Sequence, residues 1–257
     1  MRSSHSEIHR IDGVGVDLER FYPTSSEQEK KALRESYGFS PDDFILLYTA
    51  EFIPRKNHKL VFSILEELRL RVPPLRMVFC GSGRLLKGYK SLVSAAGMDD
   101  YVLFTGYTNH VADYCRLSDV LVMPSLQEGL PLALVEAMAT GLPLVASDIR
   151  GHRDVVVNYE SGILCDLGNP KSFLGAIILL YKNKSLRDEM RLRNIERAKL
   201  FSLSTAIMNM EKIYLPLIPP PPHTQSCPLS APSGHNGKAR FIGSFSRQPL
   251  PSVREAA

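Results

Sequence analysis

Two glutamates, Glu128 and Glu136, lie on either side of the predicted start of a helix. Gly129 can adopt backbone angles that are closed to other residues, and Pro131 suits a first helical position, where a missing N–H costs nothing. A helix start presents unpaired N–H groups and a partial positive charge, which bind phosphate. Carboxylates accept hydrogen bonds from sugar hydroxyls. The pattern therefore predicts a ligand that carries both phosphate and hydroxyl groups.

The spacing of the two glutamates limits the size of this ligand. In a continuous helix, Glu128 and Glu136 would lie roughly 12 Å apart along the axis. Because the interval begins in a loop, we expect a shorter separation, close to that between the sugar and the ribose of a nucleoside diphosphate sugar. Alternatively, Glu128 only stabilises the helix start and Glu136 lies on a solvated face. The two glutamates alone leave both interpretations open.

Buried strands must position this helix. Apolar runs typical of buried strands begin near residues 44, 75, 101, 120 and 143. The helix between the last two runs is expected to start near Leu130 or Pro131 and to end at Gly141 and Pro143. Strands alternating with helices predict an α/β fold, a doubly wound parallel Rossmann-like sheet, with a ligand crevice at the carboxyl ends of the strands.

The string from Glu128 to Pro143, EGLPLALVEAMATGLP, resembles the E-x7-E segment of the retaining GT-B glycosyltransferases of group 1, the family 4 type. In that family the first glutamate contacts the donor sugar and the second holds the ribose hydroxyls. The resemblance gives these roles to Glu128 and Glu136. It also implies that the backbone N–H groups of Gly129 and Leu130 meet the donor, and that the chain is one GT-B half-domain, the C-terminal, donor-binding one.

A second candidate segment follows the first predicted strand. Arg55 and Lys56 precede a helix start, where cations and N–H groups could jointly bind a diphosphate, although such a pair is also common surface charge. The resembling family has G-R-x4-K-G here, with which Ala50, Glu51 and Lys56 align. Because Glu51 departs from the family's arginine, the resemblance leaves Lys56, helped by Arg55, as the phosphate-binding cation. The sequence Lys56-Asn57-His58 also resembles a subset of the family that has Lys-Asn-His at this position.

Glycine loops follow the strands near residues 75 and 101. Gly81 belongs to a Gly-Ser-Gly turn, which could need glycine for steric reasons alone. In the family this loop lies beside the nucleotide, and the main chain at the end of the next strand packs against the base. The resemblance therefore implies that Gly81 and Tyr107 line the nucleotide site.

Composition excludes several classes of protein. The chain has 257 residues, of which 44% are hydrophobic and 23% are charged, with a formal net charge of +4. A balance this mild, without a basic run interleaved with aromatic residues, does not indicate nucleic-acid binding. Four scattered cysteines without a C-x-x-C pair indicate a reducing compartment. With neither a membrane-length apolar run nor a secretory signal, we expect a cytoplasmic protein.

The resemblance also predicts the domain boundaries. Residues 1–40 correspond to a remnant of the interdomain region, a strand and a helix around the family string G-V-D-x-x-x-F. Residues 41–214 form the nucleotide-sugar-binding domain, and residues 215–257 a Pro-rich, disordered tail. Only about ten residues precede the family string, so the acceptor-side domain is expected to be missing.

Two further features are given no role in the chemistry. His152, which follows a glycine, is interpreted as a helix-start or surface residue. The charged segment 186–200 is expected to be a helix with a solvated face.

The implied activity is retaining transfer of a sugar from a nucleotide-activated donor, by family habit a UDP-sugar, to a saccharide or lipid-linked acceptor, as in polysaccharide biosynthesis. Lys56 and the helix-start N–H groups would stabilise the leaving diphosphate as an oxyanion hole does, without a metal or other cofactor. A full-length enzyme of this kind could associate peripherally with membranes. Two alternatives remain: a non-catalytic nucleotide-sugar-binding module, and a sugar-phosphate-handling α/β protein unrelated to transfer.

Overall fold

The computed structural model describes residues 15–218, so the predicted tail from residue 219 onward and Cys227 lie outside the described residues. Six strands form one parallel sheet in the order β3-β2-β1-β4-β5-β6. The strands are β1 (Phe44–Thr49), β2 (Leu75–Cys80), β3 (Val102–Gly106), β4 (Val120–Met123), β5 (Leu144–Ser147) and β6 (Gly162–Cys165). This order confirms the doubly wound parallel fold.

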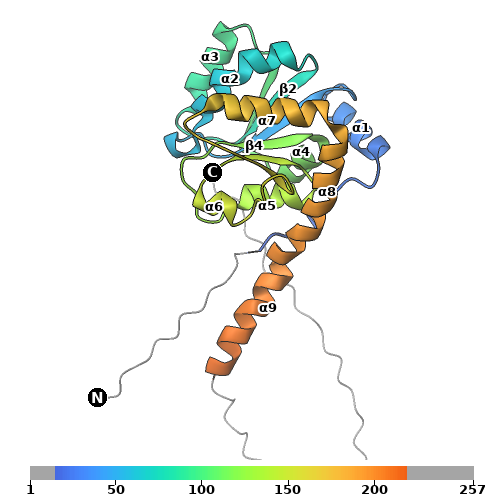
Figure 1. The fold of residues 1–257 in the computed structure, drawn as a ribbon, viewed down its shortest axis with the longest axis vertical. Helices are drawn as coiled ribbons and strands as arrows, with labels where there is room; N and C mark the ends of the chain where they lie inside the picture. The colour runs from blue at the N-terminus through green and yellow to red at the C-terminus, as the bar shows by residue number, and fades with distance from the viewer. Residues whose placement is uncertain (1–14, 219–257) are drawn as a thin grey trace, which may run out of the picture. The chain divides into compact units, whose positions relative to one another are not determined.

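Helices cover both faces of the sheet. They are α1 (Glu27–Ser36), α2 (His58–Arg71), α3 (Leu86–Ala95), α4 (Val111–Leu117), α5 (Leu132–Ala139), α6 (Arg150–Arg153), α7 (Pro170–Lys182), α8 (Lys184–Ala198) and α9 (Leu203–Tyr214), with 3-10 turns η1 (Pro54–Lys56), η2 (Lys199–Phe201) and η3 (Leu215–Leu217). Helices α2 and α7 pack together on one face, and α4 and α5 on the other (Figure 1). Helix α8 passes the amino ends of β5 and β6, where Asn194 binds the carbonyls of Leu142 and Ser161, and packs against α5. None of the helices described in residues 15–218 has the length and apolar character needed to cross a membrane.

The central strands are buried because helices cover them on both sides. Every residue of β4 and β5 is buried. Strand β1 pairs with β2 along its whole length, but its pairing with β4 is limited to Leu46 with Val120 and Leu47 with Leu121. The carboxyl ends of β1 and β4 therefore extend past their shared ladder, at the point where the strand order reverses. Doubly wound folds place their ligand crevice at this point.

A buried ion network fastens α1 to the sheet. The Asp119 carboxylate accepts hydrogen bonds from Lys30 Nζ at 2.8 Å, from Arg34 Nη2 at 2.6 Å and from the Ile45 N–H at 2.8 Å. Arg34 also donates to the Leu117 carbonyl. One carboxylate thus joins α1, β1 and the turn before β4.

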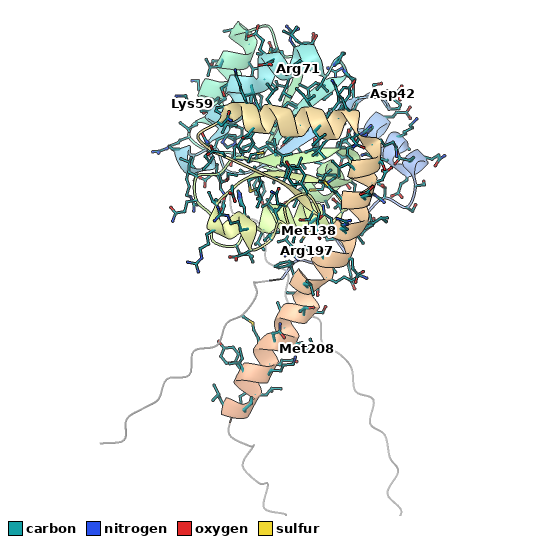
Figure 2. The ribbon with its side chains drawn as sticks, in the orientation of Figure 1. Asp42, Lys59, Arg71, Met138, Arg197 and Met208 are labelled. Atoms are coloured by element: carbon teal, nitrogen blue, oxygen red, sulfur yellow. The ribbon has the colours of Figure 1, made fainter. Side chains whose placement is uncertain are left out.

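Helix α5 begins one residue later than Pro131, the later of its two predicted starts. Pro131 has φ −80° and ψ 84°, which is not helical, and its carbonyl accepts hydrogen bonds from the Leu134 N–H at 2.9 Å and the Val135 N–H at 3.4 Å. Pro131 is therefore the N-cap and not the first helical residue. Leu132 in the first turn of α5 is 39% exposed, whereas Met138, labelled in Figure 2, is fully buried.

Helix α8 has a solvated face, as predicted, on which Glu189, Arg193 and Glu196 are exposed, but its opposite face is buried. Met190 and Asn194 are buried, and Asn194 Nδ2 donates to the carbonyls of Leu142 and Ser161, both at 2.9 Å. Arg197 Nε donates to the Val155 carbonyl at 2.8 Å. The charged groups of α8 therefore include some that fasten the helix to backbone carbonyls of the domain.

Candidate functional site

Lys56 and Glu128 form an ion pair, although they lie 72 residues apart in the sequence, in the segments that follow β1 and β4. Lys56 Nζ lies 2.5 Å from Glu128 Oε1, and the two side chains are 17% and 7% exposed, respectively. Lys56 is the last residue of η1, which follows β1, and Glu128 lies in the loop between β4 and α5. The two side chains that the resemblance makes catalytic thus occupy one place beside the strand-order reversal.

Backbone contacts hold these two segments together. The Leu126 N–H donates to the Arg55 carbonyl at 2.9 Å, and Asn57 Nδ2 donates to the Pro124 carbonyl at 3.1 Å. The Tyr48 hydroxyl, on β1, donates to the Lys56 carbonyl. The position of Lys56 relative to Glu128 is therefore set by backbone as well as by charge.

The N–H groups expected to meet the donor follow Glu128 directly. Gly129 is exposed and Leu130 half-buried, and the N–H groups of both donate no hydrogen bond within residues 15–218. These donors can therefore bind an anion without breaking a protein hydrogen bond. The Arg55 side chain is exposed and makes no ion pair in the described part of the chain, so it too can reach a ligand.

Glu136 lies in the middle of α5 and is half-buried. Burial raises the pKa of its carboxyl to about 7, and the positive charge of Arg20 opposes this rise. Arg20 itself donates to the Asn109 carbonyl at 2.9 Å, in the loop after β3. Arg20 could not be predicted as a site residue, because its electrostatic partner Glu136 lies more than a hundred residues away along the chain.

An open pocket of about 360 Å³ lies at the carboxyl ends of β1, β2 and β3. Gly81 and Tyr107 line it, together with Thr49, Ala50, Glu51, Cys80, Ser82, Thr108 and Val111. The Tyr107 side chain is 80% exposed and offers a ring face to a ligand. The pocket brings together the two residues that the resemblance places beside the nucleotide, and the other six predicted site residues are not part of its lining. Within residues 15–218, no three His, Cys, Asp or Glu side chains group as metal ligands would.

Gly81 is required by close backbone contact. Its φ of +149° is rarely adopted by residues with a side chain, and a Cβ there would lie 2.0 Å from the Ala50 carbonyl oxygen. We therefore expect Gly81→Ala to lower the free energy of unfolding by on the order of 3 kcal/mol, measured by urea denaturation. Gly88→Ala in α3 is the control: a Cβ meets nothing within 4 Å, so the helix should gain about 0.5–1 kcal/mol. Equal stabilities of the two variants would contradict this account.

The interpretation of His152 as a helix-start or surface residue is wrong in its second part. His152 lies in the short helix α6, but its side chain is fully buried. Its Nδ1 lies 2.9 Å from the Ser147 carbonyl oxygen, while Nε2 has no partner among the described residues. Burial lowers the pKa of this imidazole. The hydrogen bond to the Ser147 backbone and the charge of Glu128 oppose this shift, while the charge of Lys56 adds to it. No local pattern marks this burial, because other strands and loops provide it.

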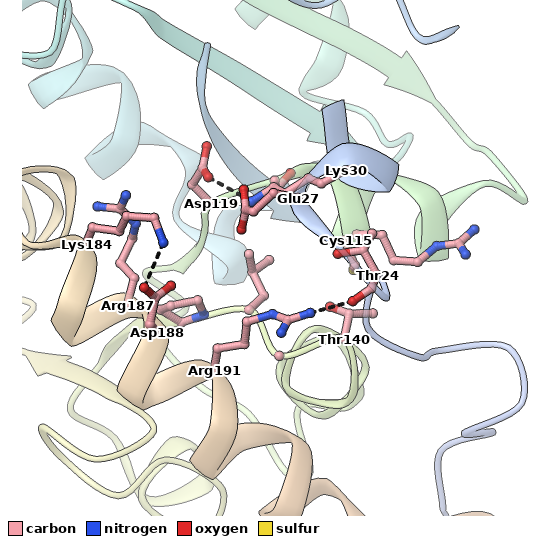
Figure 3. Close-up of a pocket in the computed structure, with 15 residues that line it drawn as sticks. Thr24, Glu27, Lys30, Cys115, Asp119, Thr140, Lys184, Arg187, Asp188 and Arg191 are labelled. Atoms are coloured by element: carbon pink, nitrogen blue, oxygen red, sulfur yellow. Dashed lines mark hydrogen bonds and ion pairs between the residues drawn. The ribbon is translucent and has the colours of Figure 1, made fainter. Parts of the chain in front are cut away.

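A second pocket, of about 80 Å³, lies at the opposite end of α5 (Figure 3). Its polar lining is largely paired internally: Lys184 with Asp188 at 2.7 Å, and Arg191 Nη2 with the Thr24 carbonyl at 2.6 Å. Thr140 and the end of α5 complete it. The bond between Arg191 and Thr24 joins α8 to the segment before α1. Because this pocket lies away from the carboxyl ends of the strands, it is not the predicted ligand crevice.

The fold is that of a Rossmann-like α/β protein, with an open pocket at the carboxyl ends of β1, β2 and β3 and the Lys56–Glu128 pair beside the strand-order reversal. The family "Glycosyl transferases group 1" matches residues 29–200, and the chain belongs to this family. EpsD of Bacillus subtilis (strain 168), whose name places it among glycosyltransferases, is 35% identical over 205 residues, covering 80% of this chain and 54% of EpsD.

Two further comparisons extend this result. The UDP-Gal:alpha-D-GlcNAc-diphosphoundecaprenol alpha-1,3-galactosyltransferase of Escherichia coli is 31% identical over 67% of this chain and 45% of its own length. The crystal structure of Anabaena Alr3699/HepE in complex with UDP superposes with a TM-score of 0.70 at 18% identity, covering 79% of this chain and 56% of that chain. The chain thus spans about half the length of the curated relatives it matches.

Proposed function

We propose that this chain is the donor-binding half of a retaining glycosyltransferase whose donor is a UDP-sugar. The observation that carries the proposal is the meeting of Lys56 and Glu128 beside the N–H groups that follow Glu128, in a chain of this family. The UDP complex of the Anabaena protein, which has the same fold, supports UDP as the nucleotide.

In the proposed complex the donor takes the place of the ion pair. The diphosphate binds Lys56 and the N–H groups of Gly129 and Leu130, while hydroxyls of the donor sugar donate to the Glu128 carboxylate. As the bond to the sugar breaks, negative charge builds up on the diphosphate. Lys56 and the two N–H groups already face that charge, so they stabilise the transition state more than the ground state.

The acceptor is proposed to be a saccharide or a lipid-linked saccharide. The name of the E. coli relative specifies a diphosphoundecaprenol-linked acceptor, which supports the second possibility and a peripheral membrane association of the whole enzyme. A reducing, cytoplasmic location is supported by Cys80, Cys115 and Cys165, which are all buried free thiols.

A non-catalytic nucleotide-sugar-binding module is the second candidate. It requires only contacts to the donor, namely Lys56, Glu128 and the N–H groups that follow Glu128. Both candidates require binding of a UDP-sugar, but only the first requires transfer when an acceptor is supplied. Release of UDP over time, measured for this chain with UDP-galactose and a saccharide acceptor, separates them.

Glu128→Gln tests the assignment of the sugar contact. We expect affinity for UDP-galactose to fall at least tenfold, because hydrogen bonds to a carboxylate are worth about 1.5–3 kcal/mol. Affinity for UDP should be kept or increased, because Lys56 loses its competing partner. Isothermal titration calorimetry with both ligands measures the two changes.

Glu67→Gln is the matched control, since Glu67 is exposed and forms an ion pair with Arg71, four residues further along α2. It should leave both affinities within a factor of two. An equal loss of UDP and UDP-galactose affinity in Glu128→Gln would place Glu128 away from the sugar and overturn its role.

A further inference from the structure

The buried imidazole of His152 is connected through Ser147 to the predicted donor loop, residues 124–130. The proposed donor chemistry gives this imidazole no role. Its Nδ1 lies 2.9 Å from the Ser147 carbonyl oxygen and 3.1 Å from the Ser147 hydroxyl oxygen. The same hydroxyl donates to the Ser125 carbonyl at 2.5 Å. All three side chains are fully buried. A continuous hydrogen-bonded path thus leads from α6 to the donor loop.

The partners fix the direction of every hydrogen bond in this path. A carbonyl oxygen only accepts, so Nδ1 of His152 must carry the proton, and the imidazole is the neutral Nδ1–H tautomer. The proton of the Ser147 hydroxyl is already donated to Ser125, so that oxygen can only accept from His152, and the single Nδ1–H is shared between the carbonyl and hydroxyl oxygens of Ser147. This shared N–H favours the hydroxyl orientation in which the Ser147 proton points to the donor loop.

A second contact joins α6 to the same loop. A Cβ at Gly151 would lie 2.4 Å from the Gly129 carbonyl oxygen and 2.5 Å from the Glu128 carbonyl oxygen. The backbone of α6 therefore lies directly against the residues that carry the predicted sugar contact and the free N–H groups. Since Gly151 and His152 are adjacent, the anchoring of the imidazole also fixes this backbone contact.

We propose that His152 is a positioning residue of the donor site. By anchoring α6 and the Ser147 hydroxyl, it holds the loop so that Glu128 and the following N–H groups face the crevice. On the other side the same loop is held by the η1 contacts of Arg55. The inference rests on the proposed function for its consequence in donor binding, but the ordering of the loop is a property of the unliganded chain.

The test compares variants that separate ring volume from hydrogen bonding. His152→Phe keeps the ring and removes both nitrogens, and Ser147→Ala removes the hydroxyl alone. In each we expect hydrogen exchange of the Leu126 amide to accelerate at least tenfold, and affinity for UDP-galactose to fall about tenfold. His152→Asn, whose amide N–H occupies the place of Nδ1–H, should restore most of the slow exchange, whereas His152→Gln should not.

Asn194→Ala is the control for loss of stability, because Asn194 is equally buried and donates to two backbone carbonyls far from this loop. It should lower the melting temperature without changing exchange of the Leu126 amide. Unchanged exchange in both His152→Phe and Ser147→Ala would overturn the inference, as would equal exchange in the Asn and Gln variants. If the wild-type chain bound no nucleotide, the proposed function would fail, and the exchange measurements would still decide the role of His152.

Discussion

Lys56→Met is expected to lower the free energy of unfolding by on the order of 3 kcal/mol and to reduce UDP-galactose affinity at least a hundredfold. The first effect arises because the Glu128 side chain, only 7% exposed, would be left without its counter-charge. Loss of one partner of a buried ion pair costs about 3–5 kcal/mol, and the lower value applies because Lys56 keeps some contact with water. The second effect arises because the diphosphate loses its cation.

The double variant Lys56→Met/Glu128→Gln separates these two effects. Without either charge, no uncompensated carboxylate is buried, so we expect the double variant to recover most of the lost stability. Donor binding should not recover, since both ligand contacts are missing. Urea denaturation and calorimetry with UDP-galactose measure the two quantities.

Lys59→Met provides the matched control, since Lys59 is an exposed residue of α2 close in sequence to Lys56 (Figure 2). Its stability should change by no more than about 0.5 kcal/mol and its affinity not at all. Recovery of donor affinity in the double variant would mean that Lys56 contributes only to stability, and the assignment of the phosphate contact would be withdrawn.

The affinity for UDP-galactose should rise about tenfold between pH 6 and pH 8, with proton release on binding. Burial raises the pKa of Glu136 to about 7, so its carboxyl is largely protonated at pH 6 in the unliganded protein. In the proposed role of Glu136, ribose hydroxyls donate to the ionised carboxylate, so binding of the donor at low pH would require loss of the proton. Calorimetry in buffers of different ionisation enthalpy measures both the affinity and the protons released.

Glu136→Gln should remove this pH dependence and leave a uniformly weak affinity. The same residue affects folding with a defined sign. Its pKa in the folded protein, about 7, lies above the ordinary 4.5, so ionisation of Glu136 opposes folding. Its contribution to stability is thus greatest below about pH 4.5 and is lost as the pH rises through about 7. An affinity that stays constant from pH 6 to pH 8 in the wild-type chain would exclude Glu136 as the ribose ligand.

The layered fold could be predicted because its strands are buried on both faces. The continuous apolar runs Phe44–Thr49 and Val120–Met123 are typical of strands that helices cover on both faces, and both strands are buried in this way. Helix α5 begins one residue after Pro131, the later of the two predicted starts. Proline restricts φ to helical values but leaves ψ free, so its preference for a first helical position does not determine where the helix begins. Pro131 adopts ψ 84° instead.

The candidate site could be predicted less completely. Lys56 and Glu128 were identified from their segments, but their direct pairing depends on contacts between the loops after β1 and β4, which local sequence does not specify. The burial of His152 depends on Ser147 and on the donor loop, so a lone histidine after a glycine gave no indication of it. The arginines of α8 illustrate a third case: Arg197 has the charge of a surface residue, yet its guanidinium binds the Val155 carbonyl.

The short ladder between β1 and β4 has a consequence for how the chain folds. Strand β2 follows β1 after a single helix, so this pair can form early, whereas β2, α3, β3 and α4 all lie between β1 and β4. Closing the chain over that distance is rewarded only by the pairing of Leu46 and Leu47 with β4, so we expect this junction to form late in folding. On this expectation the crevice is completed only after the half of the sheet that contains β2 and β3.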